Sequence, residues 1–98
     1  MTEKNLSEFF ISIQNHEWIT PAHISVYTSI FELWNQNRFE NPIKISRSKI
    51  MMMAKISGIA TYHKCIKGLV KGKYISYFPS YNPFFGSLIN VLNQSEDQ

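Results

Sequence analysis

With 98 residues, of which 44% are hydrophobic and 14% aromatic, the chain is large enough for one folded domain and too short for a second hydrophobic core. Its single cysteine excludes an intramolecular disulfide, the start MTEKNLSEFF lacks a signal-peptide pattern, and no apolar run reaches the length of a membrane span, so we expect a cytoplasmic protein without a membrane partner. The net charge of +3 is unevenly distributed, because residues 1–40 sum to −3 whereas residues 41–95 contain eight basic and no acidic residues, and this segregation predicts a surface that binds a polyanion.

The first expected helix covers about residues 3–15, within an N-terminal segment 1–17. Leu6, Phe9, Phe10 and Ile13 follow the i, i+3, i+4, i+7 spacing of an apolar helix face. Two roles remain open for this face. It can cover the core of its own domain, or it can pair with a second subunit in a homodimer.

The second expected helix, about residues 21–37, has a strong start signal. Thr20 offers a capping hydroxyl, and Pro21 follows at the first helical position, where its missing N–H has no consequence. The apolar stripe is wide, so this helix is expected to be the most buried element. Its members are Ile24, Val26, Tyr27, Ile30, Phe31, Leu33 and Trp34.

A short strand is expected at residues 43–45. Asn41 precedes Pro42, which disfavours helical dihedral angles and ends the preceding helix. Ile43 and Ile45 then alternate with a lysine, the pattern of a half-buried strand.

A short helix should follow the strand. Ser46 can cap it, and Ile50, Met53 and Ala54 fall on one side. Three consecutive methionines cannot share one helix face, so Met52 is expected to be partly exposed.

The next expected helix, about residues 58–71, separates an apolar side from a cationic side. On a helical wheel the apolar side holds Ile59, Tyr62, Cys65, Ile66 and Leu69, and the opposite side holds Ala60, Lys64, Lys67 and Lys71. Cys65 is therefore interpreted as a core residue. With His63 it does not complete a metal site or a nucleophile and base pair.

Two strands, about 74–78 and 87–92, are expected to form a hairpin. The intervening residues Pro79, Asn82, Pro83 and Gly86 demand a long loop. Phe84 and Phe85 within it can pack on the core, contact a second subunit, or wedge between base steps of DNA. Residues 93–98, NQSEDQ, are interpreted as a frayed tail.

This order of elements resembles that of a winged helix-turn-helix domain over residues 20–92. The stretch ISRSKIMMMAKISGIATYHKCIKGLVKGKYISYFPS is similar to a helix-turn-helix that leads into a wing, most similar to small winged-helix proteins of bacterial mobile elements and to DNA-binding domains of plasmid replication proteins and transcription regulators. The resemblance implies an α+β fold with a three-helix core, a short strand and a C-terminal β-hairpin wing, here with an extra N-terminal helix. Gly68 and the position of Gly72 depart from the usual pattern.

The resemblance also implies which residues contact DNA. The helix at 58–71 would lie in the major groove, with its N-terminal part nearest the base edges. Sequence would then be read by Gly58, Ala60, Thr61, His63 and Lys64. Phosphates would be contacted by Ser46, Arg47, Ser48, Lys67 and Lys71, and the wing would contribute Lys73, Ser80, Tyr81 and Asn82.

The sequence therefore predicts sequence-specific binding of double-stranded DNA, as a transcription regulator or as an accessory protein of a mobile element. No paired carboxylates, nucleophile and base set or Gly-rich phosphate loop indicates catalysis, and neither a cofactor nor a metal is expected. Two alternatives remain: a winged-helix docking module for another protein, anchored by Tyr81, Phe84 and Phe85, and an RNA-binding protein whose tyrosines stack on bases.

Overall fold

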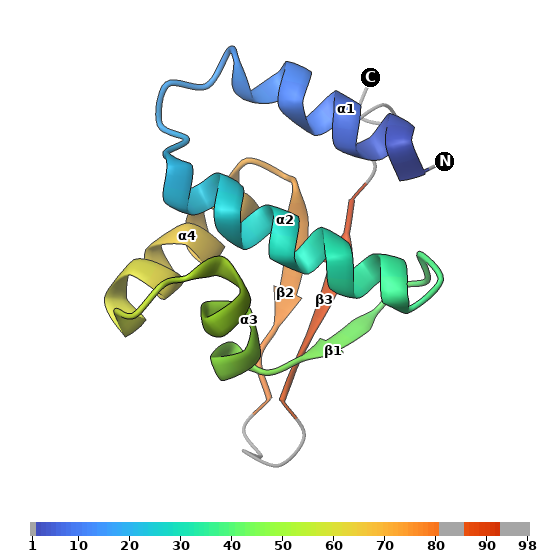
Figure 1. The fold of residues 1–98 in the computed structure, drawn as a ribbon, viewed down its shortest axis with the longest axis vertical. Coiled ribbons are helices and arrows are strands. Elements are labelled where there is room, and N and C mark those ends of the chain that lie inside the picture. The colour runs from blue at the N-terminus through green and yellow to red at the C-terminus, as the bar shows by residue number, and fades with distance from the viewer. Residues whose placement is uncertain (1, 81–85, 93–98) are drawn as a thin grey trace.

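The computed structural model describes residues 2–80 and 86–92, with side chains from residue 6 onward. This part of the chain forms a small α+β structure with four helices and a three-stranded antiparallel sheet (Figure 1). The elements in chain order are α1 (Thr2–Ile13), α2 (Pro21–Gln36), β1 (Ile43–Ile45), α3 (Arg47–Ala54), α4 (Ile59–Lys71), β2 (Ile75–Phe78) and β3 (Ser87–Val91). Each expected helix and strand is present, and the ends of those with predicted bounds differ by two residues at most.

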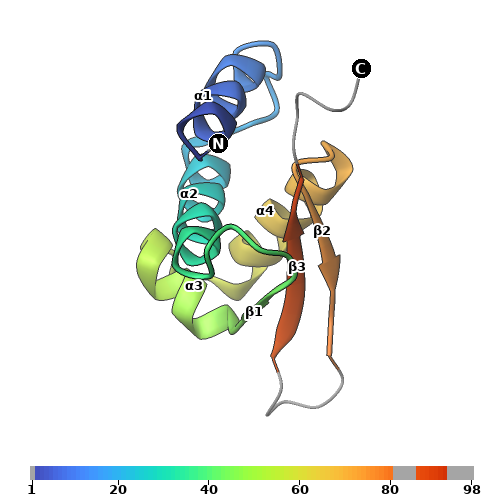
Figure 2. The same cartoon turned by 90° about the vertical axis from the view of Figure 1, so that its right-hand side faces the viewer.

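The helices and the sheet form two layers. Figure 2 shows α1, α2 and α3 on one side and the hairpin of β2 and β3 on the other, with α4 between them. Helix α2 contacts α3, α4 and β3, so it lies at the centre of the structure. Four of its side chains, Val26, Tyr27, Ile30 and Trp34, are buried in the core, which confirms the expectation from their spacing.

The strand order is β1-β3-β2, so the last strand lies between the other two. Ile75 is paired with Val91, and both point into the core. The pair of Phe78 and Leu88 is three positions further along the hairpin and falls on the opposite face, because side chains alternate along a strand. The exposed fractions of these two side chains are 53% and 41%, and no described element covers that outer face (Figure 2).

Asn41 ties the start of β1 to the end of β3. Its side-chain amide donates to the carbonyl oxygen of Val91 at 3.0 Å, and its side-chain oxygen accepts from the Val91 N–H at 3.0 Å. Two bonds of this kind imitate the pairing of one more strand residue. Asn41 therefore extends the sheet. It does not end the preceding helix as expected, because α2 already stops at Gln36, with Asn37 as its C-cap residue.

Helix α1 covers the core of its own domain. Phe9 is fully buried and stacks on Tyr27 with ring centroids 3.9 Å apart and an interplanar angle of 12°. Leu6 and Ile13 pack against the same core. The side of α1 that contains Phe9 therefore covers the core of its own domain. Phe10 lies on the exposed side of the helix. Pairing of α1 with a second subunit stays a prediction.

Both predicted caps are present. Thr20 caps α2, and the N–H of Lys49 donates to the Ser46 hydroxyl oxygen at 3.2 Å at the start of α3. Met52 is 66% exposed, as its place between two other methionines indicated.

The burial of Ile59 was predicted incorrectly. The wheel placed it on the apolar side of its helix, but half of the side chain is exposed. Ile59 is the first residue of α4 and lies at the edge of the apolar arc, so nothing in the preceding turn of the helix shields it. The helix otherwise begins after Gly58, which is its N-cap residue, and ends before Gly72, which is its C-cap residue, as expected.

Candidate nucleic-acid interface

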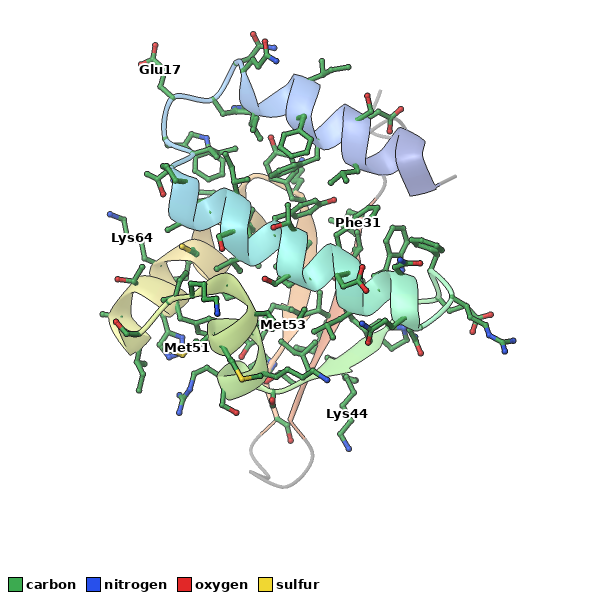
Figure 3. All side chains as sticks on the ribbon, viewed as in Figure 1. Glu17, Phe31, Lys44, Met51, Met53 and Lys64 are labelled. Atoms are coloured by element: carbon green, nitrogen blue, oxygen red, sulfur yellow. The ribbon has the colours of Figure 1, made fainter. Side chains whose placement is uncertain are left out.

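Three lysines form an exposed row along α4, here called the lysine ridge: Lys64, Lys67 and Lys71. The opposite side of the helix is anchored in the core by Tyr62, Cys65, Ile66 and Leu69. Because that side is held, the helix cannot turn its lysines inward. Figure 3 shows Lys64 projecting outward from α4, and the chain contains no acidic residue between 41 and 95 that would neutralise the ridge locally.

The residues predicted to read bases are gathered at the N-terminal half of the same helix. Gly58, Ala60, Thr61, His63 and Lys64 are all exposed. Gly58 has no side chain with which to cap the helix, so the first backbone N–H groups of α4 have no side-chain partner from the N-cap residue. The structure thus brings together all five residues at one accessible helix end.

The start of α3 lies close to this helix. Arg47 and Ser48 are exposed in the first turn of α3, whereas the Ser46 hydroxyl is used as the cap. Burial raises the pKa of Tyr62 to about 12, with a further contribution from Tyr77, and the positive charge of Arg47 opposes this increase. Arg47, from α3, and Tyr77, from β2, thus both influence the same residue of α4.

A groove of about 340 Å³ runs between α4 and β2. Lys67 and Lys71 of the ridge form part of its wall, and Tyr77 comes from the strand. The Tyr77 hydroxyl is held at 3.1 Å from the Ser87 hydroxyl across the hairpin. The remaining lining residues are His63, Ile66 and Val70. Helix and hairpin therefore share one concave surface.

Val70 and Tyr77 were not among the predicted site residues. Val70 lies one turn after Ile66 at the edge of the apolar arc, and its exposed fraction is 39%. Tyr77 lies within the expected strand 74–78, where no local pattern marked it as a site residue. The wheel position of Val70 was a usable signal, but the proximity of Tyr77 to α4 depends on tertiary packing.

Two of the four residues predicted to contact DNA from the wing belong to the described part of the chain. Lys73 lies exposed in the turn between α4 and β2, with a positive φ of 65°, and Ser80 is exposed at the end of the described part of the loop. Tyr81 and Asn82 lie outside the described residues, as do Phe84 and Phe85.

Cys65 is a core residue. It is 1% exposed, and burial raises the pKa of its thiol, which disfavours the reactive thiolate. Within residues 2–80 and 86–92, no three His, Cys, Asp or Glu side chains are grouped so that they could hold a metal ion. His63 instead lies beside Tyr62, with ring centroids 5.5 Å apart.

Comparisons of this chain with protein-family models, with curated proteins and with solved structures find no match. In the described part of the chain, none of the helices has both the length and the apolar composition needed to cross a bilayer.

Proposed function

We propose that this protein binds double-stranded DNA sequence-specifically, in the manner of a winged helix-turn-helix domain, and acts as a transcription regulator or as an accessory protein of a mobile element. In this proposal α3 and α4 form the helix-turn-helix, and β2 and β3 form the wing. The observation that carries the proposal is the exposed lysine ridge, which is continuous with the groove shared by α4 and β2. An α-helix fits the width of the DNA major groove, and clustered lysines attract its phosphates.

The two halves of α4 have different roles in this proposal. At the N-terminal half, Ala60 and Thr61 are small enough to let the helix approach the base edges, and Lys64 can donate to guanine. Lys71 is almost two turns further along, where the helix rises out of the groove toward the backbone. Contacts at Lys71 position the protein, whereas contacts at Lys64 carry sequence information.

The experiment compares the two lysines on a duplex selected from a random pool and on its scrambled counterpart, by fluorescence anisotropy at several salt concentrations. If about five phosphates are neutralised, log affinity falls with log salt at a slope of about −4 to −5. Lys64→Ala should reduce the preference for the selected duplex, whereas Lys71→Ala should weaken both duplexes equally and flatten the slope by about one.

Lys44→Ala is the matched control. It removes the same charge from β1, on the sheet face that points away from the helices, and Figure 3 shows Lys44 apart from Lys64. Its affinity should stay within about twofold of the wild type. Identical behaviour of all three variants would contradict the assigned surface.

The docking alternative has one observation in its favour: the exposed pair of Phe78 and Leu88 on the outer face of the sheet. Single exposed apolar residues are common, but two in direct cross-strand register form a small continuous patch. Retention on heparin that is lost at moderate salt, together with a mobility shift of random duplex, favours DNA binding. Salt-insensitive binding to a partner protein that Phe78→Ser abolishes favours docking.

A homodimer through α1 would have to use Phe10 and Ile11, which are 41% and 62% exposed, because Phe9 is committed to the core. Two subunits would place their recognition helices on half-sites separated by about 34 Å, one turn of DNA. Sedimentation of the wild type and of an Ile11→Asp variant tests this pairing, and a wild-type monomer at all concentrations would contradict it.

A further inference from the structure

A cavity of about 590 Å³ lies at the meeting point of three segments that are distant in the sequence. The link between α1 and α2 contributes His16 and Trp18, and the first turn of α2 contributes His23. The opposite wall comes from α4 and the turn that follows it: Lys64, Gly68, Lys71, Gly72 and Lys73. A volume of this size is within the range of small-molecule sites, about 300–1,000 Å³.

An aromatic side chain forms part of the cavity wall. Gly68 of α4 and Gly72, the C-cap residue of that helix, are about one turn apart, and the Trp18 indole lies against both. A methyl group at Gly68 would be 3.1 Å from Cζ3 of Trp18, and one at Gly72 would be 2.8 Å from Cζ2. The indole is nevertheless 40% exposed, so part of it remains available for another ring to contact.

The rim of the cavity is cationic. Lys64, Lys71 and Lys73 line it, and none of the described lining residues is an aspartate or a glutamate. Several like charges around a concave apolar surface create a strong positive potential, because field lines are focused by the low-dielectric walls. The rim therefore favours a ligand that carries negative charge.

A buried histidine also lines this cavity. His23 is 4% exposed, and its Nδ1 accepts the N–H of Thr20 at 3.0 Å. The neutral ring therefore carries its proton on Nε2, which would lie only 2.8 Å from a methyl group on Gly68, a lining residue. Every side-chain hydrogen bond of His23 that joins described residues uses its Nδ1, so these residues leave Nε2 without a hydrogen-bond partner.

The pKa of His23 is lowered first by burial and then by the positive charge of Lys64. The neutral ring, with one fixed donor, is thus the form present near neutral pH.

We propose that this cavity binds a small planar aromatic molecule that carries a carboxylate or a phosphate. The ring would stack on Trp18, the lysine rim would attract the charge, and the Nε2–H of His23 would donate to a polar atom of the ligand. Each part of this chemistry requires a different segment of the chain, which is the arrangement of a built site rather than a charged surface.

The binding test uses the whole chain and two series of probes, monitored by the amide and indole N–H signals in ¹⁵N NMR titrations. The carboxylate series is 2-naphthoate and its neutral amide, and the phosphate series is AMP, adenosine and inorganic phosphate. At least one aromatic anion should saturate the shifts of Trp18, Gly68 and Gly72, with an affinity about tenfold above those of its neutral analogue and of inorganic phosphate. The series that saturates identifies the anionic group.

Two variants and two controls make the test specific. Trp18→Leu and Lys71→Gln should each weaken binding about three- to tenfold. Phe10→Leu changes an aromatic side chain of nearly the same exposure, 41% against 40%, and Lys49→Gln removes an exposed lysine of α3 that does not line the cavity. Both controls should bind as the wild type does. If Trp18→Leu fails to fold, the exposed Lys71 still provides a variant in a folded protein.

Three outcomes would overturn the proposal: no saturable shift with either aromatic anion, equal affinity for inorganic phosphate alone, or unchanged binding by both variants. A further consequence, competition between the ligand and duplex DNA for Lys64 and Lys71, rests on the proposed function. The titrations contain no DNA, so they can fail or succeed independently of it.

Discussion

Trp18 lies against the backbone of Gly68, fifty residues later in the chain, and the absence of a side chain at Gly68 makes this contact possible. A methyl group at Gly68 would be 3.1 Å from the indole and 2.8 Å from Nε2 of His23. This contact also accounts for a glycine in the interior of α4. The helix accepts a residue of low helix propensity because the link between α1 and α2 packs on it.

Gly68→Ala should destabilise the protein, although helix propensity alone predicts a gain of about 1 kcal/mol. The new methyl group meets the His23 ring, which is buried and held by Thr20, so the ring cannot move without losing that bond. We expect the free energy of unfolding to fall by about 1 kcal/mol in urea denaturation. Gly58→Ser is the control, because the nearest atom to its Cβ would be at an ordinary 3.5 Å. A stabilised Gly68→Ala variant would show that the contact is loose.

Phe9→Ala should have the largest effect of any substitution in α1. Phe9 is fully buried and stacked on Tyr27, and truncation of a buried phenylalanine lowers the free energy of unfolding by about 3–5 kcal/mol. Phe10→Ala, one residue later on the exposed side, should lower it by less than about 1 kcal/mol. Urea denaturation of both variants measures the difference, and similar values would mean that α1 is not docked through Phe9.

Asn41→Ala should loosen the junction of β1 and β3. The variant loses both hydrogen bonds to Val91, each worth about 0.5–1.5 kcal/mol, and leaves the two backbone groups of Val91 without those partners. Amide hydrogen exchange at Val91 should accelerate, together with a loss of about 1–3 kcal/mol of stability. Asn35→Ala, on the exposed surface of α2, should change neither quantity, and unchanged exchange at Val91 in Asn41→Ala would contradict the assignment.

The pH dependence of stability should contain a contribution from His23. Its pKa in the folded protein lies below the ordinary value of 6.5, so the unfolded chain binds more protons in the range just below 6.5. Stability should therefore be highest above pH 6.5 and decrease as the pH falls through that range. Denaturation midpoints measured between about pH 5 and 7.5 test this expectation.

His23→Gln is the matched variant for the pH experiment. Thr20 and His23 form a capping box, and glutamine is a usual residue at the position of His23 in that motif. The variant should keep the cap and lose part of the acid sensitivity. An equally steep pH dependence in the variant would assign the effect to other groups.

Local patterns determined most of the elements of this protein. Three features depend on residues within a few positions of one another: the start of α2 at Thr20–Pro21, the cap at Ser46, and the separation of the apolar and cationic sides of α4 on a helical wheel. The structure has all three. The same wheel failed for Ile59, because burial at a helix end depends on what packs beside it. The DNA-binding role assigned to the ridge stays a prediction.

The amino-acid sequence by itself determined where the helices and strands begin, which side of each is apolar, and that positive charge collects in residues 41–95. Only the tertiary structure decided that Tyr77 meets α4 across a groove and that Trp18 and His23 meet Gly68 around a cavity. Backbone hydrogen bonds and side-chain periodicity act over a few residues, so a sequence pattern records them. Contacts between residues fifty positions apart depend on how every intervening element packs, and no local pattern specifies that.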